Sequence, residues 1–202
     1  MDIIKKYFPK LSDNQIDKLY GLYDIYADWN EKINLISRKD FNRNNFETRH
    51  ILHSLSIFKL CNIKSRSKVL DVGTGGGFPG IVLAIAYPSV SFHLLDARKK
   101  KLMAVENITQ QLKINNVSVI WSRIEDYHKK YDYITGRAVK DLNLFYTWTK
   151  KNLKQPYGKI LYLTGGELDK NLINKASLLK VYELKEVFEE DYFETKKLIV
   201  FK

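Results

Sequence analysis

The first third of the chain spaces its hydrophobic residues as amphipathic helices do, with apolar side chains recurring at intervals of three and four. Ser12 and Gln15 form the capping box that typically opens such a helix. The short polar segment 62–67 then predicts a boundary. We therefore expect a small N-terminal helical subdomain over residues 1–62. Its predicted elements are a helix at 12–28, a loop at 32–40 and a helix at 45–61.

After this boundary, short apolar runs alternate with segments of helical length. Such alternation is typical of right-handed βαβ units on a mostly parallel sheet. The last two strands have no clear helix between them, so we expect them to pair antiparallel at one edge. An α/β, Rossmann-like domain is therefore predicted over residues 63–202. Its predicted strands are 68–73, 90–96, 117–121, 131–135, 158–164, 180–188 and 194–201, and its predicted helices are 81–87, 98–113, 141–153 and 167–176.

A glycine-rich loop is the strongest chemical signal in the chain. Five glycines stand between the first predicted strand and the next predicted helix, at positions 73, 75, 76, 77 and 80. Open α/β sheets bind ligands at this place. Glycines let the backbone approach a ligand and supply positive φ angles. We therefore expect Gly73, Gly75 and Gly77 to bind a cofactor.

Two carboxylates near this loop narrow the choice of cofactor. Residues 75–80 match the literal dinucleotide fingerprint, but the register of the strand and the charge of Asp71 oppose a pyrophosphate. S-adenosylmethionine has no phosphate, and its two cationic groups would favour the carboxylate of Asp71. Asp96 ends the second predicted strand, where a carboxylate can accept both ribose hydroxyls. Because NAD has the same ribose, Asp96 leaves an NAD-dependent oxidoreductase open.

Charge and composition add a candidate partner. The 202 residues include 34 Lys and Arg against 23 Asp and Glu, a formal net charge of +11, and residues 98–154 hold 13 basic and 5 acidic residues. This excess favours a polyanionic partner. No apolar segment has the length of a membrane span, no secretory signal opens the chain, and Cys61 is the single cysteine. We expect a cytoplasmic protein without a membrane segment, a disulfide or a metal site.

Several longer motifs carry a family resemblance. They are WNEKINLIS (29–37), RHILHSL (49–55), VLDVGTGGGFPGIVLAI (69–85), LLDARKKK (94–101), NVSVIWSRIED (116–126) and YDYITGRAV (131–139). On these motifs the chain resembles the bacterial small-subunit ribosomal RNA guanine-N7 methyltransferases, also called glucose-inhibited division protein B. The resemblance implies a class I S-adenosylmethionine-dependent methyltransferase fold with an N-terminal helical subdomain. It also implies S-adenosyl-L-methionine as methyl donor and 16S ribosomal RNA, free or in the small subunit, as substrate.

The resemblance assigns roles to individual residues. It implies that Gly73 and Phe78 line the cofactor, and that Asp96 takes the ribose. Ile124 and Glu125 are expected to face the adenine. Arg137, just past the fourth predicted strand, is expected where the transferred methyl group lies. We also expect a monomer, and a non-catalytic RNA-binding module on the same fold is the remaining alternative.

Guanine N7 has a free lone pair and no proton to remove, so its methylation needs alignment and not a general base. An arginine can hold a guanine by its N7 and O6 atoms. Arg137 is the first candidate for this contact and Arg123 the second. Arg49 and His50, from the RHILHSL motif, are further candidates for contact with the substrate.

A run of cations begins the predicted helix at 98–113, where the helix macrodipole favours anions. This arrangement is locally unfavourable for the helix. We therefore expect RNA phosphates to bind Lys99, Lys100 and Lys101.

Three residues depart from the family pattern. His53 stands where the family usually has Asp, Lys101 where it usually has Arg, and Thr164 where it usually has Lys before a glycine. If the missing lysine holds RNA, another residue of this chain must do so. Lys140 is the candidate that the sequence offers.

Overall fold

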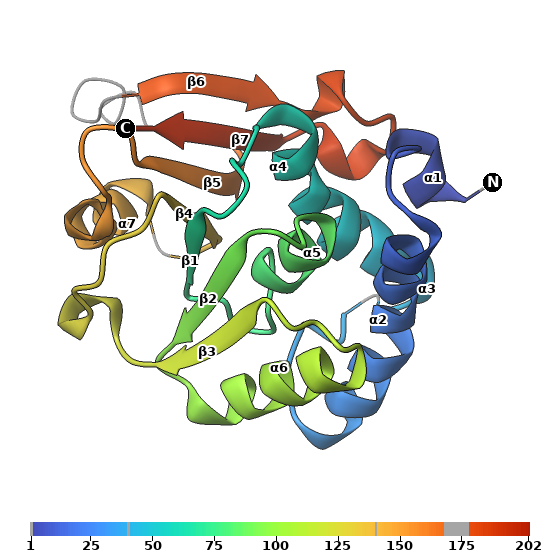
Figure 1. Ribbon diagram of the computed structural model, residues 1–202. Coiled ribbons are helices and arrows are strands. Elements are labelled where there is room, and N and C mark those ends of the chain that lie inside the picture. Colours follow the sequence, from blue (N-terminus) through green and yellow to red (C-terminus); the bar gives the residue numbers. More distant parts are fainter. Residues whose placement is uncertain (1, 40, 140, 168–177) are drawn as a thin grey trace.

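The computed structural model describes residues 2–39, 41–139, 141–167 and 178–202. Its seven strands are β1 (Lys68–Val72), β2 (Ser91–Asp96), β3 (Val117–Trp121), β4 (Tyr133–Arg137), β5 (Lys159–Gly165), β6 (Leu178–Glu183) and β7 (Lys196–Phe201). They form one sheet through the middle of the molecule, in the order β3-β2-β1-β4-β5-β7-β6 (Figure 1). The first five strands are parallel, and β7 is antiparallel to both β5 and β6. The predicted parallel sheet with an antiparallel edge is confirmed.

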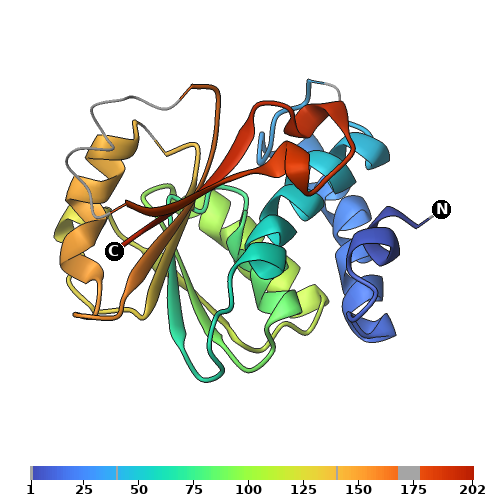
Figure 2. The same cartoon turned by 90° about the horizontal axis from the view of Figure 1, so that it is seen from above.

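Helices cover both faces of this sheet. The α-helices are α1 (Ile3–Tyr7), α2 (Asp13–Lys32), α3 (Arg43–Phe46), α4 (His53–Leu60), α5 (Gly80–Ala86), α6 (Lys99–Gln111) and α7 (Leu142–Thr149). Short helical turns are the π segment η1 (Glu47–Leu52) and the 3₁₀ turns η2 (Ile124–Asp126), η3 (Lys150–Asn152), η4 (Leu184–Glu186) and η5 (Asp191–Phe193). In Figure 2, α7 lies on one face of the sheet, and α4 to α6 lie on the other with the N-terminal helices outside them.

The N-terminal helices differ from the prediction in two places. The capping box at Ser12 begins α2 as predicted, but the preceding helix α1 was not predicted. The helix predicted at 45–61 is a run of α3, η1 and α4, with a π turn in its middle.

Among the described residues, no helix has both the length and the apolar character that a membrane crossing requires.

The C-terminal part also differs from the prediction. The strand predicted at 180–188 ends at Glu183, where the chain turns into η4. The helix predicted at 141–153 is α7 followed by the short turn η3. The helix predicted at 167–176 lies, apart from its first residue, outside the described residues.

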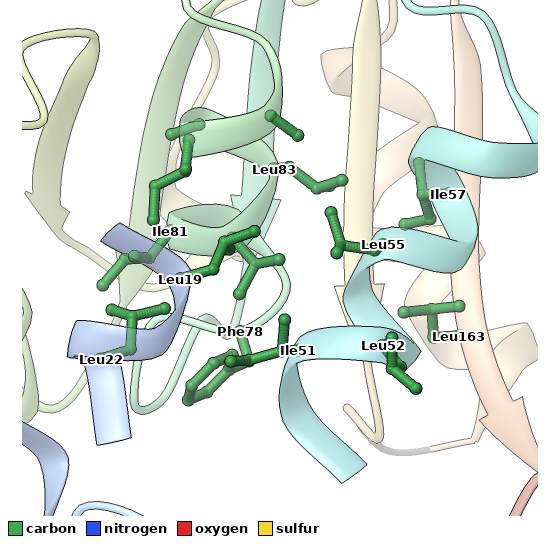
Figure 3. Packing of buried hydrophobic residues seen from close by; sticks show 14 of the residues in the cluster. Leu19, Leu22, Ile51, Leu52, Leu55, Ile57, Phe78, Ile81, Leu83 and Leu163 are labelled. Atoms are coloured by element: carbon green, nitrogen blue, oxygen red, sulfur yellow. The ribbon is translucent and has the colours of Figure 1, made fainter. Parts of the chain in front are cut away.

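Buried hydrophobic residues form one cluster on each face of the sheet. In the larger cluster, Leu19 and Leu22 of α2 pack near Phe78, Ile81 of α5 and Ile51 of η1 (Figure 3). The N-terminal helices therefore share a core with the sheet. This packing holds the π segment η1 beside the ends of the strands.

Asn116, just before β3, connects the end of α5 with the start of β2. Its side-chain Nδ2 lies 3.0 Å from the carbonyl oxygen of Ala84, 3.1 Å from that of Tyr87 and 2.9 Å from that of Val90. These carbonyls lie where the helix ends and leaves backbone acceptors without helical partners. The side-chain amide of Asn116 therefore donates to carbonyls on both sides of the turn between α5 and β2.

We expect Asn116→Ala to lower the free energy of unfolding by about 1–3 kcal/mol, because it removes a donor shared by three carbonyls around this turn. Urea denaturation measures this difference. The exposed neighbour provides the control, and Asn115→Ala should change stability by less than about 0.5 kcal/mol. Equal losses in the two variants would contradict the role given to Asn116.

Candidate functional site

The glycine loop follows β1 at the carboxyl edge of the sheet. Gly73 has φ +65°, and a Cβ there would lie 2.8 Å from Cγ2 of Val139. Gly77 has φ +93°, and a Cβ there would lie 2.5 Å from Cδ1 of Ile81. Both positions therefore require glycine for conformation and for space. The loop also accepts a hydrogen bond at the Gly76 carbonyl from the buried hydroxyl of Tyr26.

Asp71 lies beneath this loop and is completely buried. Its Oδ2 accepts hydrogen bonds from Thr74 Oγ1 at 2.6 Å and from the Gly80 amide at 3.1 Å. Its Oδ1 accepts one from Thr135 Oγ1 of β4 at 2.8 Å. Burial raises the pKa of Asp71 to about 6, although these hydrogen bonds oppose the shift. Asp71 organises the loop and does not line either of the cavities described next.

A cavity of about 500 Å³ lies between the glycine loop and the ends of β2 and β4; we call it the Asp96 cleft. Asp96 Oδ2 accepts a hydrogen bond from the Gly75 amide, and Oδ1 accepts one from the Arg98 amide, each at 2.8 Å. A carboxylate has lone pairs beyond these two, so Asp96 can also accept from ribose hydroxyls. Apolar side chains complete the lining, including those of Leu95, Ile124 and Trp148. An ordered carboxylate beside an apolar wall fits an adenosine.

A second cavity, of about 540 Å³, lies between η1 and the end of β5; we call it the His50 cleft. Arg137 and Ala138 line both cavities. The two clefts therefore meet at the carboxyl end of β4. A ligand in one cleft would face a ligand in the other across these two residues.

Arg137 joins β4 to the π segment at this junction. It donates from Nη1 to the Arg49 carbonyl at 2.9 Å and from Nη2 to His50 Nδ1 at 3.0 Å. Its guanidinium carbon lies 5.3 Å from the centroid of the Phe78 ring. Because a guanidinium can only donate, Nδ1 of His50 must accept, and the ring proton is therefore on Nε2. Burial and the charge of Arg137 lower the pKa of His50 to about 3, which keeps this ring neutral.

The structure brings together most of the residues predicted to bind the cofactor. Of these, the ones that line the Asp96 cleft are Gly73, Gly75, Asp96, Ile124, Glu125 and Arg137; Arg123, predicted as a substrate contact, lines the same cleft. Gly77 and Phe78 lie deeper, and Phe78 packs 4.8 Å from the His50 ring and 5.0 Å from the Tyr26 ring between centroids. Asp71, Gly77 and Phe78 therefore do not line the Asp96 cleft but lie behind its lining residues.

The predicted substrate residues divide into two groups. Arg49, His50 and Arg137 line the His50 cleft. Lys99 and Lys100 are exposed at the start of α6, whereas Lys101 donates from Nζ to the Leu35 carbonyl at 3.0 Å. Lys140 lies outside the described residues.

Sequence reasoning missed the contribution of the C-terminal segment. Tyr192 of η5 and Lys196 of β7 line the His50 cleft, together with His53 and Thr164. Tyr192 belongs to an acidic stretch that has no catalytic motif. The only available signal was the antiparallel edge, because it places the start of β7 beside the carboxyl end of β5.

Comparison with a solved structure defines the fold. A SAM-dependent methyltransferase from Aquifex aeolicus has a TM-score of 0.59 to this chain, at 17% sequence identity, and the match covers 79% of this chain and 93% of that one. The fold is therefore the class I methyltransferase fold, as predicted. The glycine loop and the Asp96 cleft lie at the carboxyl ends of its central strands.

Sequence comparison defines the family. The model of the GidB family, rRNA small subunit methyltransferase G, matches residues 15–199. A ribosomal RNA small subunit methyltransferase G from Christiangramia forsetii is 44% identical over 204 residues, covering 98% of this chain and 95% of the relative. One from Flavobacterium johnsoniae is 43% identical, with 98% and 96% covered. The chain belongs to this family, and the predicted family and class of S-adenosylmethionine-dependent methyltransferase are confirmed.

Asp71 makes a testable contribution to the pH dependence of stability. Its pKa is about 6 in the folded protein against an ordinary value of 3.8, so the folded state binds the proton more tightly. Stability from this group is therefore greatest at low pH and decreases as the pH rises from about 4 to 6. Relative to Asp71→Asn, we expect the unfolding free energy to fall by about 2 kcal/mol over this interval, out of about 3 kcal/mol across the whole titration.

Urea denaturation of both proteins at several pH values gives this difference. A ¹³C NMR titration of the Asp71 carboxyl in the unmodified protein provides an independent reading. A difference curve that stays flat between pH 4 and 6, or a carboxyl that titrates near 4, would contradict the prediction.

Proposed function

We propose that this protein transfers the methyl group of S-adenosylmethionine to N7 of a guanine in 16S ribosomal RNA. The observation that carries this proposal is the junction of the two clefts at Arg137 and Ala138, in a chain of this family. S-adenosylmethionine supplies a methyl group on a sulfonium, which a nucleophile can attack in line. The protein must bind the cofactor and the RNA, align them and exclude water from between them.

The Asp96 cleft holds the cofactor in this proposal. The Asp96 carboxylate accepts from the ribose hydroxyls, and its hydrogen bonds to the Gly75 and Arg98 amides fix its orientation. Ile124 and Glu125 would hold the adenine. Gly73 and Arg137, which line the same cleft, would hold the part of the cofactor that carries the methyl group.

The His50 cleft holds the guanine. A donor aimed at N7 would occupy the lone pair that must attack, so a donor is useful only at the neighbouring O6. His50 is neutral and carries its proton on Nε2, which suits it to donate to O6. Arg137 holds His50 in this tautomer, and two of its N–H groups are already donated to η1. We therefore assign the O6 contact to His50 in place of a bidentate contact from Arg137.

Several other residues are assigned to RNA binding. Lys99 and Lys100 are exposed, and Lys99 Nζ lies 4.8 Å from the ring of Trp121, whose side chain is itself exposed. Arg123 is exposed at the rim of the Asp96 cleft. We assign RNA phosphates to these three cations, and not to Lys101, whose amino group donates to the Leu35 carbonyl.

The protein acts as a monomer in the cytoplasm. In this proposal residues 1–62 are the helical subdomain, which forms one wall of the His50 cleft.

Asp96→Asn should weaken binding of S-adenosylhomocysteine by about 10- to 100-fold, because it removes charge-assisted hydrogen bonds to the ribose. Isothermal titration calorimetry measures this affinity. Asp126→Asn is the matched control, since Asp126 is exposed in the nearby turn η2 and does not line the cleft. If the two variants bind equally well, Asp96 does not hold the ribose.

The activity itself is tested with labelled S-adenosylmethionine and 16S ribosomal RNA from cells that lack this modification. Free RNA and assembled small subunits are assayed in parallel. We expect label in the RNA, and chain cleavage at one guanine after treatment with borohydride and aniline, which detect N7-methylguanine. RNA that already carries the modification is the control and should accept no label. No cleavage with either substrate would overturn the proposal.

A further inference from the structure

The wall of the His50 cleft is strongly cationic. Among its described lining residues, Lys39, Arg49, Arg137 and Lys196 are basic and none is Asp or Glu. Nothing in the proposed alignment of the base accounts for Lys196. An uncompensated cation at a cleft wall is suited to an anionic part of the substrate.

Lys196 begins β7 and pairs with Gly165 of β5 in the antiparallel register. A Cβ at position 165 would lie 2.9 Å from Lys196 Nζ, so the glycine leaves room for this amino group. Lys196 Nζ donates to Thr195 Oγ1 at 3.1 Å, and no carboxylate of the described residues lies within 4.0 Å of it. The next residue, Lys197, instead contacts Glu183 at 2.6 Å. Successive strand residues point to opposite faces, so only Lys196 is directed to the cleft.

The ring of Tyr192 lies near two cations that come from distant parts of the chain. Lys196 Nζ lies 4.8 Å from the centroid of its ring, and the guanidinium carbon of Arg49 lies 5.9 Å from it. The Tyr192 hydroxyl lies 3.1 Å from His53 Nδ1, which fixes the ring against η1 and α4. His53 also lines the cleft, and its Nε2 is buried without a hydrogen-bond partner. The Tyr192 ring thus supports the Lys196 amino group at the wall of the cleft, where it would attract an anion.

We propose that Lys196, held against the Tyr192 ring, forms a phosphate subsite for the backbone of the target nucleotide. This inference rests on the proposed function, because it takes RNA as the substrate. A guanine whose O6 faces His50 carries its backbone toward the wall of the same cleft. The C-terminal strand thereby holds the nucleotide, while the π segment and β4 align its base. Lys196 is in this sense a substrate-binding residue and not a participant in methyl transfer.

Equilibrium binding of radiolabelled, protein-free 16S ribosomal RNA tests the subsite, with S-adenosylhomocysteine present and over a range of salt concentrations. Lys196→Gln should weaken binding by about 3- to 10-fold and reduce the slope of log K against log salt by about one. Lys196→Arg should restore binding, because it keeps the charge. In the methylation assay, Lys196→Gln should raise KM for RNA and leave kcat unchanged at saturating RNA.

Lys197→Gln is the matched control, since its amino group contacts Glu183. It should bind RNA as the unmodified protein does. S-adenosylhomocysteine affinity should be equal in all variants, and all should be folded at the assay temperature, although Lys197→Gln loses its contact with Glu183. Unchanged RNA binding by Lys196→Gln, or a loss of kcat alone, would overturn the subsite.

The same experiments separate this inference from the proposed function. RNA that binds through Lys196 but accepts no methyl group would support the subsite and overturn the proposed function. RNA that is methylated without any dependence on Lys196 would support the proposed function and overturn the subsite.

Discussion

The geometry of the site depends on one buried carboxylate. Asp71 accepts hydrogen bonds from the glycine loop at Thr74, from the start of α5 at Gly80 and from β4 at Thr135. A buried carboxylate is costly unless such donors satisfy it. The loop, the helix and the neighbouring strand therefore keep the positions that satisfy Asp71. The Asp96 cleft and the end of β4 are built on this arrangement.

A second polar interaction connects the two clefts. Arg137 ends β4 and donates to the Arg49 carbonyl and to His50 in the π segment. π segments are often found at functional sites. Here the segment belongs to the N-terminal helices and is held by the large hydrophobic cluster. The N-terminal helices thus carry His50, while Arg137 of β4 fixes its tautomer and orientation.

The C-terminal edge completes the site from a third direction. β7 is antiparallel to β5, so its first residue lies beside the last residue of β5. This register brings Lys196 and the preceding turn with Tyr192 to the His50 cleft. A parallel strand at the same place would have begun at the opposite edge of the sheet. The antiparallel edge that the sequence pattern predicts therefore has a direct consequence for the proposed substrate cleft.

The sequence by itself determined the alternation of strands and helices from β1 to β5, the glycine loop and the place of Asp96, because these depend on local periodicity and on the meeting of parallel strand ends. It also indicated Arg137, through its place just past a strand. Only the tertiary structure decided that Asp71 lies below the loop, that Arg137 is bonded to η1, and that Lys101 is held by Leu35 while Lys196 faces the cleft. Each of these depends on side-chain contacts between segments far apart in the chain. Hydrophobic patterns record which face of an element is buried, but not which polar partner it meets there.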